Sequence, residues 1–115
     1  MMPDLSTVKI FVRPGPTDMR KQIDGLASIV YTSFKSDPLD GSLYLFASQC
    51  RRKLKILYWD RNGFCLWQKR LEEDRFPWPK DEDDVKQISS SQLRMLLEGI
   101  DFWHAHQTRV YKFAG

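Results

Sequence analysis

The stretch KLKILYWDRNGFCLWQKRL, from Lys53 to Leu71, decides the expected fold because it joins two strand-like runs through a turn signal. Within it, DRNG places Asp60 at the first position of a type I turn and Gly63 at the last, where a glycine bulge can close a hairpin. This loop predicts that Asp60 lies opposite Phe64. One face of the hairpin then carries Leu54, Ile56, Tyr58 and Leu66, and the other carries Lys55, Leu57, Trp59, Cys65, Trp67 and Lys69.

The segments before and after this hairpin extend the prediction. SLYLFAS (42–48) predicts a preceding strand, so that an antiparallel meander forms. TVKIFVR (7–13) is rich in β-branched residues and ends at a proline, which predicts a first strand. The acidic stretch from 72 to 84 contains two prolines, which a central strand does not tolerate, so we expect an exposed, projecting loop there.

A first, long helix is expected from Asp18 to Phe34, directly after the stop signal PGP. Thr17 is placed to accept hydrogen bonds from the first free amides of this helix, and Asp18 stands where the helix dipole favours negative charge. Gly25 costs about 1 kcal/mol inside a helix, so another backbone or a ligand is expected to come close to it. Apolar side chains recur at helical spacing, which suits packing on the aliphatic hairpin face: Met19, Ile23, Leu26, Ala27, Val30 and Phe34.

A second, shorter helix is expected near the C-terminus, after a short edge strand at VKQIS (85–89). Ser89 and Gln92 have the spacing of a capping box, and the helix is predicted to end near Gly99. Its apolar face consists of Leu93, Leu96, Leu97 and Ile100. These elements predict an α+β fold in one domain, 1–115, with an antiparallel sheet of four or five strands and both helices packed on it. The tail 104–115 is poorly specified and is expected to be flexible.

Composition limits the class of protein. With 115 residues, 42% of them hydrophobic and 13% aromatic, the chain can bury enough apolar surface for one domain with one core. No apolar run approaches the roughly 18 residues of a membrane span, and the N-terminus lacks the pattern of a signal peptide. We therefore expect a cytoplasmic protein that has no membrane partner, in which Cys50 and Cys65 remain thiols.

The charge is distributed unevenly along the chain. Residues 1–71 contain 12 Lys/Arg and 6 Asp/Glu, whereas residues 72–101 contain 4 Lys/Arg and 9 Asp/Glu. Such asymmetry suits a basic face for a polyanion and an acidic face for a protein partner. It is equally typical of an ordinary solvated surface.

Catalysis and metal binding have little support in the sequence. The carboxylates outside the acidic loop that could hold Mg²⁺ each have a simpler structural explanation as helix, turn or helix-end residues: Asp18, Asp24, Asp60 and Asp101. Cys50 and Cys65 stand alone, and His104 and His106 lie in the tail, so a zinc-binding spacing is absent. We expect no catalytic site, no metal and no cofactor.

Basic and aromatic residues adjoin in the hairpin, which is typical of nucleic-acid binding. Lys55 and Lys69 share a predicted face with Trp59 and Trp67, beside the basic run CRRKLK (50–55). Bases stack on aromatic rings, and Lys/Arg neutralise phosphates with release of counterions. The alternative is that both tryptophans are core residues covered by the second helix.

Three strings, TDMRKQIDGL, CLWQKRLEEDRFPWP and SSSQLRMLLEGID, occur in this order. In this combination the chain resembles the TnpB accessory proteins of IS66-type bacterial insertion sequences, often called the Orf2-like family, from Val8 to about Trp103. The sequence departs from the family at Gln22, where a small residue is common. The family's motif residues map onto Thr17, Asp18, Met19, Arg20, Lys21, Asp24, Gly25, Leu26, Arg75, Phe76, Trp78, Pro79, Leu96, Leu97, Glu98, Gly99 and Ile100.

The resemblance implies a non-catalytic protein that is required for transposition alongside a large acidic-triad transposase and a small helix-turn-helix-type protein. Two hypotheses for its action remain open. In the first, it contacts DNA, the ends of the insertion sequence, through a basic surface consisting of Arg20, Lys21, Arg51, Arg52, Lys53, Lys55, Lys69 and Arg70. In the second, it is an adaptor that docks on the transposase, without touching DNA, through its apolar second helix and its acidic loop, with the residues Asp81, Glu82, Asp83 and Asp84.

Overall fold

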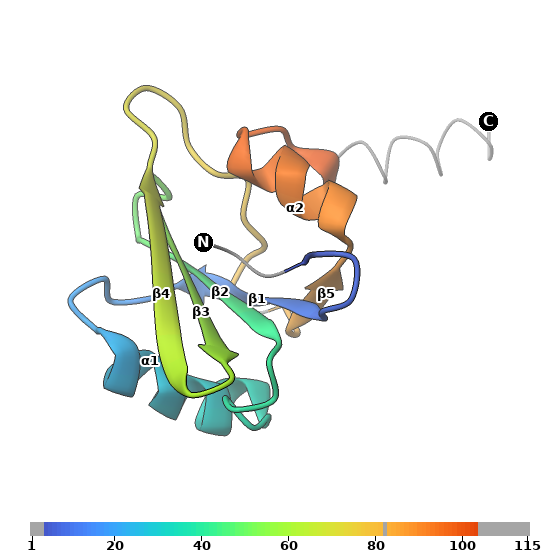
Figure 1. Ribbon diagram of the computed structural model, residues 1–115. Helices are drawn as coiled ribbons and strands as arrows, with labels where there is room; N and C mark the ends of the chain where they lie inside the picture. Colours follow the sequence, from blue (N-terminus) through green and yellow to red (C-terminus); the bar gives the residue numbers. More distant parts are fainter. Residues whose placement is uncertain (1–3, 82, 104–115) are drawn as a thin grey trace.

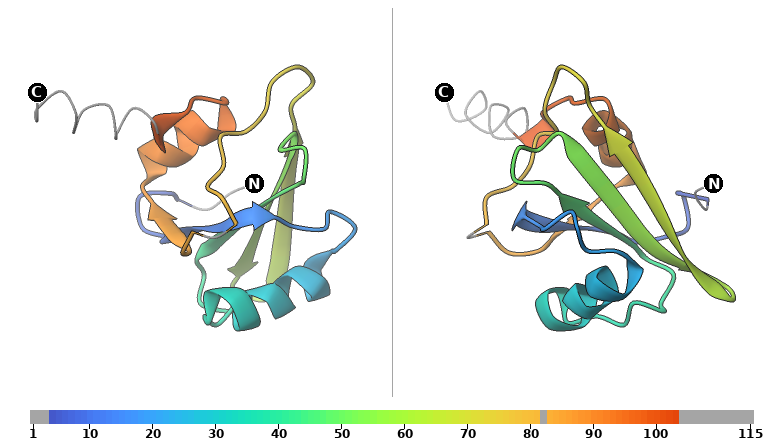
Figure 2. Two further views of the ribbon diagram at one scale, coloured as in Figure 1. Left: turned by 180° about the vertical axis from the view of Figure 1, so that it is seen from behind. Right: turned by 90° about the vertical axis from the view of Figure 1, so that its left-hand side faces the viewer.

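Five strands form one mixed sheet, in the order β4-β3-β2-β1-β5, in the computed structural model, which describes residues 4–81 and 83–103 (Figure 1). Helix α1 continues directly into a π-helical segment, η1, and helix α2 lies on the opposite side of the sheet (Figure 2). The bounds are β1 Ile10–Pro16, α1 Ile23–Ile29, η1 Val30–Phe34, β2 Leu43–Ala47, β3 Lys53–Asp60, β4 Gly63–Arg70, β5 Lys86–Ile88 and α2 Ser90–Leu97. This confirms the α+β class. The tail 104–115 lies outside the described residues.

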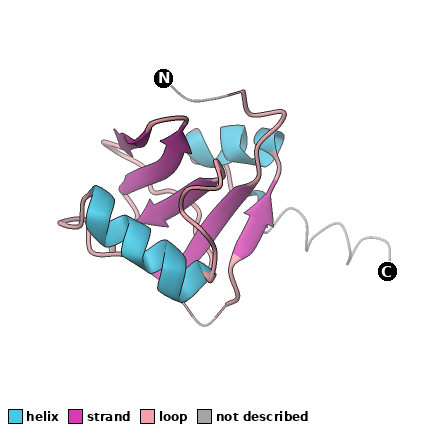
Figure 3. Cartoon of the chain, turned by 60° about the horizontal axis from the view of Figure 1, so that its bottom comes forward, coloured by secondary structure: helices cyan, strands magenta, loops and turns pink. Residues whose placement is uncertain are grey.

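Three of the four strand pairs are antiparallel, as expected, including the β2-β3-β4 meander and the edge strand β5 on β1. The β1–β2 pair differs because it is parallel, with Ile10 opposite Leu43 and Val12 opposite Leu45. The physical reason is the connection: α1 and η1 carry the chain back to the end of the sheet where β1 began, and such a helical crossover places the next strand parallel. Figure 3 shows the two helices flanking the sheet.

The predicted register of the β3–β4 hairpin is wrong by one residue. Asp60 pairs with Gly63 rather than Phe64, so the loop contains only Arg61 and Asn62. Arg61, with φ of 53°, adopts the positive φ that the prediction gave to Gly63. Because side chains alternate along a strand, this shift exchanges the two faces of β4. Cys65, Trp67 and Lys69 therefore share a face with Leu54, Ile56 and Tyr58, whereas Leu66 shares one with Leu57.

Helix α1 packs on a different face from the predicted one. Leu26 and Val30 are fully buried against Tyr44, Phe46 and Leu57. The register explains the difference, because Leu54 and Ile56 point to the other side of the sheet. The sheet thus has a hydrophobic cluster on each face, instead of the single core expected.

The second cluster lies under α2. Leu93 and Leu96 of the helix pack there with Leu54 and Ile56 of β3. The segment 72–84, predicted to project as an exposed loop, contributes to this cluster, because Phe76 is 1% and Trp78 is 8% exposed. The prediction of exposure was wrong for these two residues, since the two prolines exclude a strand but leave the neighbouring aromatic side chains free to turn inward.

The two hairpin tryptophans lie on opposite faces of the sheet. Trp67 is half-buried against the cluster under α2, which agrees with the alternative in which it is a core residue. Trp59, also half-buried, packs edge-on against Phe64 with ring centroids 5.1 Å apart. The structure therefore does not gather Trp59, Trp67, Lys55 and Lys69 on one face.

Helix α1 begins at Ile23, five residues later than expected. Thr17 does not cap it: its N–H donates to the Ala47 carbonyl at 2.7 Å, and its hydroxyl accepts from Arg13 Nη1 at 3.0 Å. The sheet therefore holds the main chain at Thr17 in an extended form. The close protein neighbour of Gly25 is the side chain of Lys21, 3.2 Å from where a Cβ would lie, rather than another backbone.

Helix α2 begins and ends as predicted. The Ser89 hydroxyl accepts from the Gln92 N–H at 3.1 Å, and the Gln92 side chain accepts from the Ser89 N–H at 2.9 Å. Gly99 follows the helix with φ of 80°. Within the described residues, no helix is long and apolar enough to cross a membrane.

The capping box yields a first testable prediction. Ser89→Ala should lower the free energy of unfolding by about 1 kcal/mol, because a free amide of the first turn loses its acceptor. Urea denaturation measures this loss. Ser90→Ala, one residue further on, is the matched control and should change the free energy by less than about 0.5 kcal/mol. Equal losses for the two variants would contradict the capping role.

Candidate nucleic-acid interface

Exposed cations gather at one end of the sheet, where the β1–α1 segment meets the β2–β3 turn. Pro16 pairs with Ala47, and the Lys55 side chain donates to the carbonyls of Met19 and Lys21, so the two segments lie side by side. We call this surface the basic end of the sheet. Its exposed residues are Arg20, Lys21, Arg51, Arg52, Lys53 and Arg70.

The β2–β3 turn is held by its own hydrogen bonds. Ser48 N–H donates to the Lys53 carbonyl at 3.0 Å, Lys53 N–H donates to the Ser48 hydroxyl at 3.1 Å, and Arg51 N–H donates to the Ser48 carbonyl at 3.0 Å. Arg51 takes a left-handed conformation, with φ of 61°. Because polar groups inside the turn satisfy its backbone, the three consecutive cations Arg51, Arg52 and Lys53 remain at the surface.

Two of the predicted DNA contacts have structural roles instead. Lys55 is only 3% exposed, and its ammonium group donates to the carbonyls of Met19 and Lys21, both at 2.8 Å. Burial lowers the pKa of Lys55. Lys69 is half-buried and donates to the Leu97 carbonyl at the end of α2, at 2.9 Å. The ammonium groups of both residues are engaged by main-chain carbonyls, so we leave them out of the interface.

Arg20 lies at the surface but has a carboxylate partner. Its guanidinium donates to both carboxylate oxygens of Asp18, at 3.0 and 2.8 Å, and Asp18 also accepts its N–H at 2.9 Å. These hydrogen bonds lower the pKa of Asp18 from 3.8 to about 2. The sequence pattern predicted that Asp18 stabilises the first turn of the helix through the helix dipole. In the structure, Asp18 instead caps a turn that precedes α1.

Arg70, at the end of β4, is likewise paired, with Glu72 at 2.8 Å. Arg52 donates to the main-chain carbonyl of Glu72 at 3.1 Å. Within the described ranges, Lys21, Arg51, Arg52 and Lys53 form no ion pair with a carboxylate. Their positive charges are thus available to an anionic partner.

The acidic residues proposed for partner binding lie on a segment that is docked on β1. Gly15 N–H donates to the Pro79 carbonyl at 3.0 Å, and the backbone of Gly15 lies directly against Asp81. Asp81, Asp83 and Asp84 are exposed. Glu82 lies outside the described residues.

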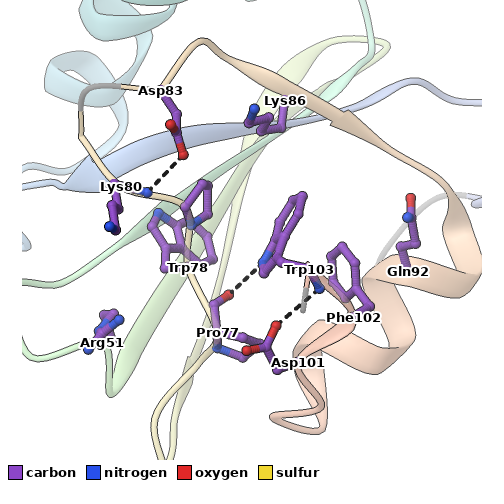
Figure 4. A pocket seen from close by; sticks show the side chains of 11 residues that line it. Arg51, Pro77, Trp78, Lys80, Asp83, Lys86, Gln92, Asp101, Phe102 and Trp103 are labelled. Atoms are coloured by element: carbon purple, nitrogen blue, oxygen red, sulfur yellow. Dashed lines mark hydrogen bonds between the residues drawn. The ribbon is translucent and has the colours of Figure 1, made fainter. Parts of the chain in front are cut away.

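A hollow of about 740 Å³ lies between this acidic segment, the β2–β3 turn and the residues after α2 (Figure 4). Three aromatic residues line it. Trp78 donates its indole N–H to the Arg13 carbonyl at 2.8 Å, and Trp103 donates to the Pro77 carbonyl at 3.3 Å. The ring of Phe102 packs on Trp103 with centroids 4.2 Å apart. We call this feature the aromatic hollow.

Cations lie on two sides of the aromatic hollow: Figure 4 shows Arg51 and Lys80 on one side of Trp78 and Lys86 on another. Sequence reasoning missed Lys80, Lys86 and Trp103 as site residues. The first two lie in the acidic part of the chain, and only the fold brings them to the same hollow as Arg51. Trp78 was noted solely as part of a family motif, and its position between two prolines was the available signal.

In the described part of the chain, no three His, Cys, Asp or Glu side chains lie close enough together to hold a metal ion. Asp18 caps its own turn, and Asp60 is next to the β3–β4 loop. Cys50 and Cys65 are free thiols, as expected.

A family model described as IS66 Orf2 like protein matches residues 8–107. The chain belongs to this family, the accessory proteins of IS66-type insertion sequences, which confirms the resemblance and gives it a transposition-related accessory role. The uncharacterized protein y4hO of Sinorhizobium fredii is 40% identical over 108 residues, 94% of each chain. The uncharacterized protein y4jC of the same organism is 30% identical over 95 residues, 83% of this chain and 81% of that one. No solved structure is significantly similar to the chain.

Proposed function

We propose that this protein acts without catalysis by contacting DNA through the basic end of the sheet, and that it helps to assemble the insertion-sequence ends with the large transposase and the small helix-turn-helix-type protein. The observation that carries the proposal is the rigid β2–β3 turn, which presents Arg51, Arg52 and Lys53 to solvent without a carboxylate partner in the described residues. Strand cleavage belongs to the transposase.

Electrostatics favours a phosphate backbone as the ligand of this turn. Each Lys or Arg that neutralises a phosphate releases a counterion, and this contribution is independent of base sequence. Arg20 and Arg70 add less, because a phosphate must compete with Asp18 and Glu72 for them. Both pairs are exposed, however, and exposed pairs are weak. The expected binding is therefore phosphate-dominated, with little sequence preference.

The proposal is tested by measuring the affinity of the protein for two DNA duplexes of equal length, a terminal repeat of the element and a random sequence. Each affinity is measured at two salt concentrations. The variant R51Q/R52Q/K53Q should weaken binding of both duplexes by at least tenfold and reduce the slope of log affinity against log salt by about 3. The control K9Q/R61Q/R94Q removes three exposed cations away from the basic end and should leave affinity nearly unchanged. Equal losses for the two variants would show nonspecific charge effects instead.

The docked acidic segment favours a second candidate function, that of a protein adaptor. Asp81, Asp83 and Asp84 are exposed together on a segment that β1 holds in place. Neutralising them as Asn should then slow association with the purified transposase, because exposed charges act mainly through steering. If no duplex or single strand binds even at low salt, the DNA proposal fails and the adaptor hypothesis is the one retained.

A further inference from the structure

The aromatic hollow offers a ligand one partly accessible ring, that of the half-buried Trp103, whereas Trp78 and Phe102 are buried and form its apolar wall. The indole N–H groups of Trp78 and Trp103 both bind main-chain carbonyls, which fixes the positions of the rings and uses their donors. The volume of about 740 Å³ lies in the range of roughly 300–1,000 Å³ that is typical of small-ligand sites. A flat aromatic group is therefore the chemistry that this lining fits best.

The cations around the hollow indicate that the ligand carries a negatively charged group next to its flat aromatic part. Arg51, Lys80 and Lys86 line the hollow, and within residues 4–81 and 83–103 none of them is ion-paired. The two carboxylates of the lining accept main-chain N–H groups: Asp83 from Lys80 at 3.2 Å, and Asp101 from Trp103 at 3.0 Å. Nucleotides combine a flat base with a phosphate, and proteins that bind single strands pair aromatic faces with a basic path.

A second, smaller hollow connects this site to the basic end of the sheet. It has a volume of about 240 Å³ and shares Arg51, Trp78, Pro79 and Lys80 with the aromatic hollow. Its remaining lining residues carry no charge: Gly15, Pro16, Ser48 and Gln49. Because Arg51 belongs to both hollows and to the basic end, a DNA backbone held at the basic end can continue past Arg51 and Lys80 into the aromatic hollow.

We propose that the aromatic hollow binds an unpaired base of single-stranded DNA, with its phosphates on Arg51, Lys80 and Lys86. The proposal rests on the proposed function, because it assumes that the protein contacts DNA. A base within a duplex is stacked on both sides and cannot present its face to Trp103, so the hollow selects unpaired nucleotides. Such nucleotides occur where the ends of a mobile element are opened or distorted.

Fluorescence anisotropy with a labelled oligothymidine strand and with a labelled hairpin duplex tests this. The variant K80Q/K86Q should weaken single-strand binding about tenfold and leave duplex binding within twofold. R52Q/K53Q removes the same charge from the basic end and should weaken duplex binding more than single-strand binding. Trp103→Leu tests stacking and should weaken single-strand binding tenfold or more. A urea unfolding transition equal to that of the unmodified protein shows that Trp103→Leu is folded. If Trp103→Leu does not fold, K80Q/K86Q still tests the proposal.

The outcomes separate the two proposals. If the duplex binds but the single strand does not, or if single-strand binding is insensitive to K80Q/K86Q, the inference about the hollow is overturned while DNA contact at the basic end stands. If neither probe binds at low salt, the proposed function fails and takes the inference with it. If only the single strand binds and K80Q/K86Q abolishes that binding, the hollow is supported and the basic end is not.

Discussion

Val30→Asp should abolish the cooperative unfolding transition of this protein. Val30 is fully buried between the helical layer and the sheet, within a cluster of apolar side chains. Burying an unpaired charge costs many kcal/mol, whereas a domain of this size is stable by only about 5–15 kcal/mol. Circular dichroism during thermal and urea unfolding measures the result.

Tyr31→Asp is the matched control, because its side chain lies one residue away and is 61% exposed. It should keep a sigmoidal transition, shifted by less than about 1 kcal/mol. Ile23→Asp lies between the two cases, since Ile23 is half-buried at the edge of the same cluster. A cooperative transition in Val30→Asp, equal to that of the control, would contradict the packing of α1 and η1 on this face.

Lys55→Met should lower the free energy of unfolding by about 3 kcal/mol. The two carbonyls that accept from its ammonium group, those of Met19 and Lys21, would lose their charge-assisted donor, and such bonds contribute about 1.5–3 kcal/mol each. Met keeps most of the side-chain volume, so the loss reports the hydrogen bonds rather than a cavity. Urea denaturation measures the change, and hydrogen exchange at residues 17–22 should speed up as that segment loosens.

Lys53→Met controls for the loss of one positive charge on the same strand. Lys53 is exposed, so its replacement should change stability by less than about 0.5 kcal/mol. If Lys53→Met destabilised the protein as much as Lys55→Met, a general charge effect would explain both, and the specific role of Lys55 would be wrong.

Local sequence patterns predicted those elements whose interactions close within a few residues. The capping box of Ser89 and Gln92 and the glycine at 99 define both ends of α2, because each partner lies within one helical turn. The β2-β3-β4 meander and the exposed run Arg51–Lys53 were predicted for the same reason, and β5 was predicted as a strand from its own residues. Strand-like runs, turn residues and consecutive cations each predict local structure without information about distant segments.

Features that depend on distant partners were not predictable from these patterns. Thr17 has a good local capping signal, but the Ala47 carbonyl takes its N–H and Lys55 takes the carbonyls of the following turn, so α1 begins at Ile23. In the β3–β4 loop, turns of two and three residues differ little in energy. The packing of Trp67 on the α2 side and of Leu66 on the α1 side decides between them.

The sequence by itself determined the class of fold, the family and the exposed basic turn, because each rests on residues adjacent in the chain. Only the tertiary structure decided which cations belong to a site. Lys55 belongs to the same basic run as Lys53 yet is buried, whereas Lys80 and Lys86 come from the acidic part of the chain and line the same hollow as Arg51. The physical reason is that burial and charge proximity are set by packing between segments far apart in sequence.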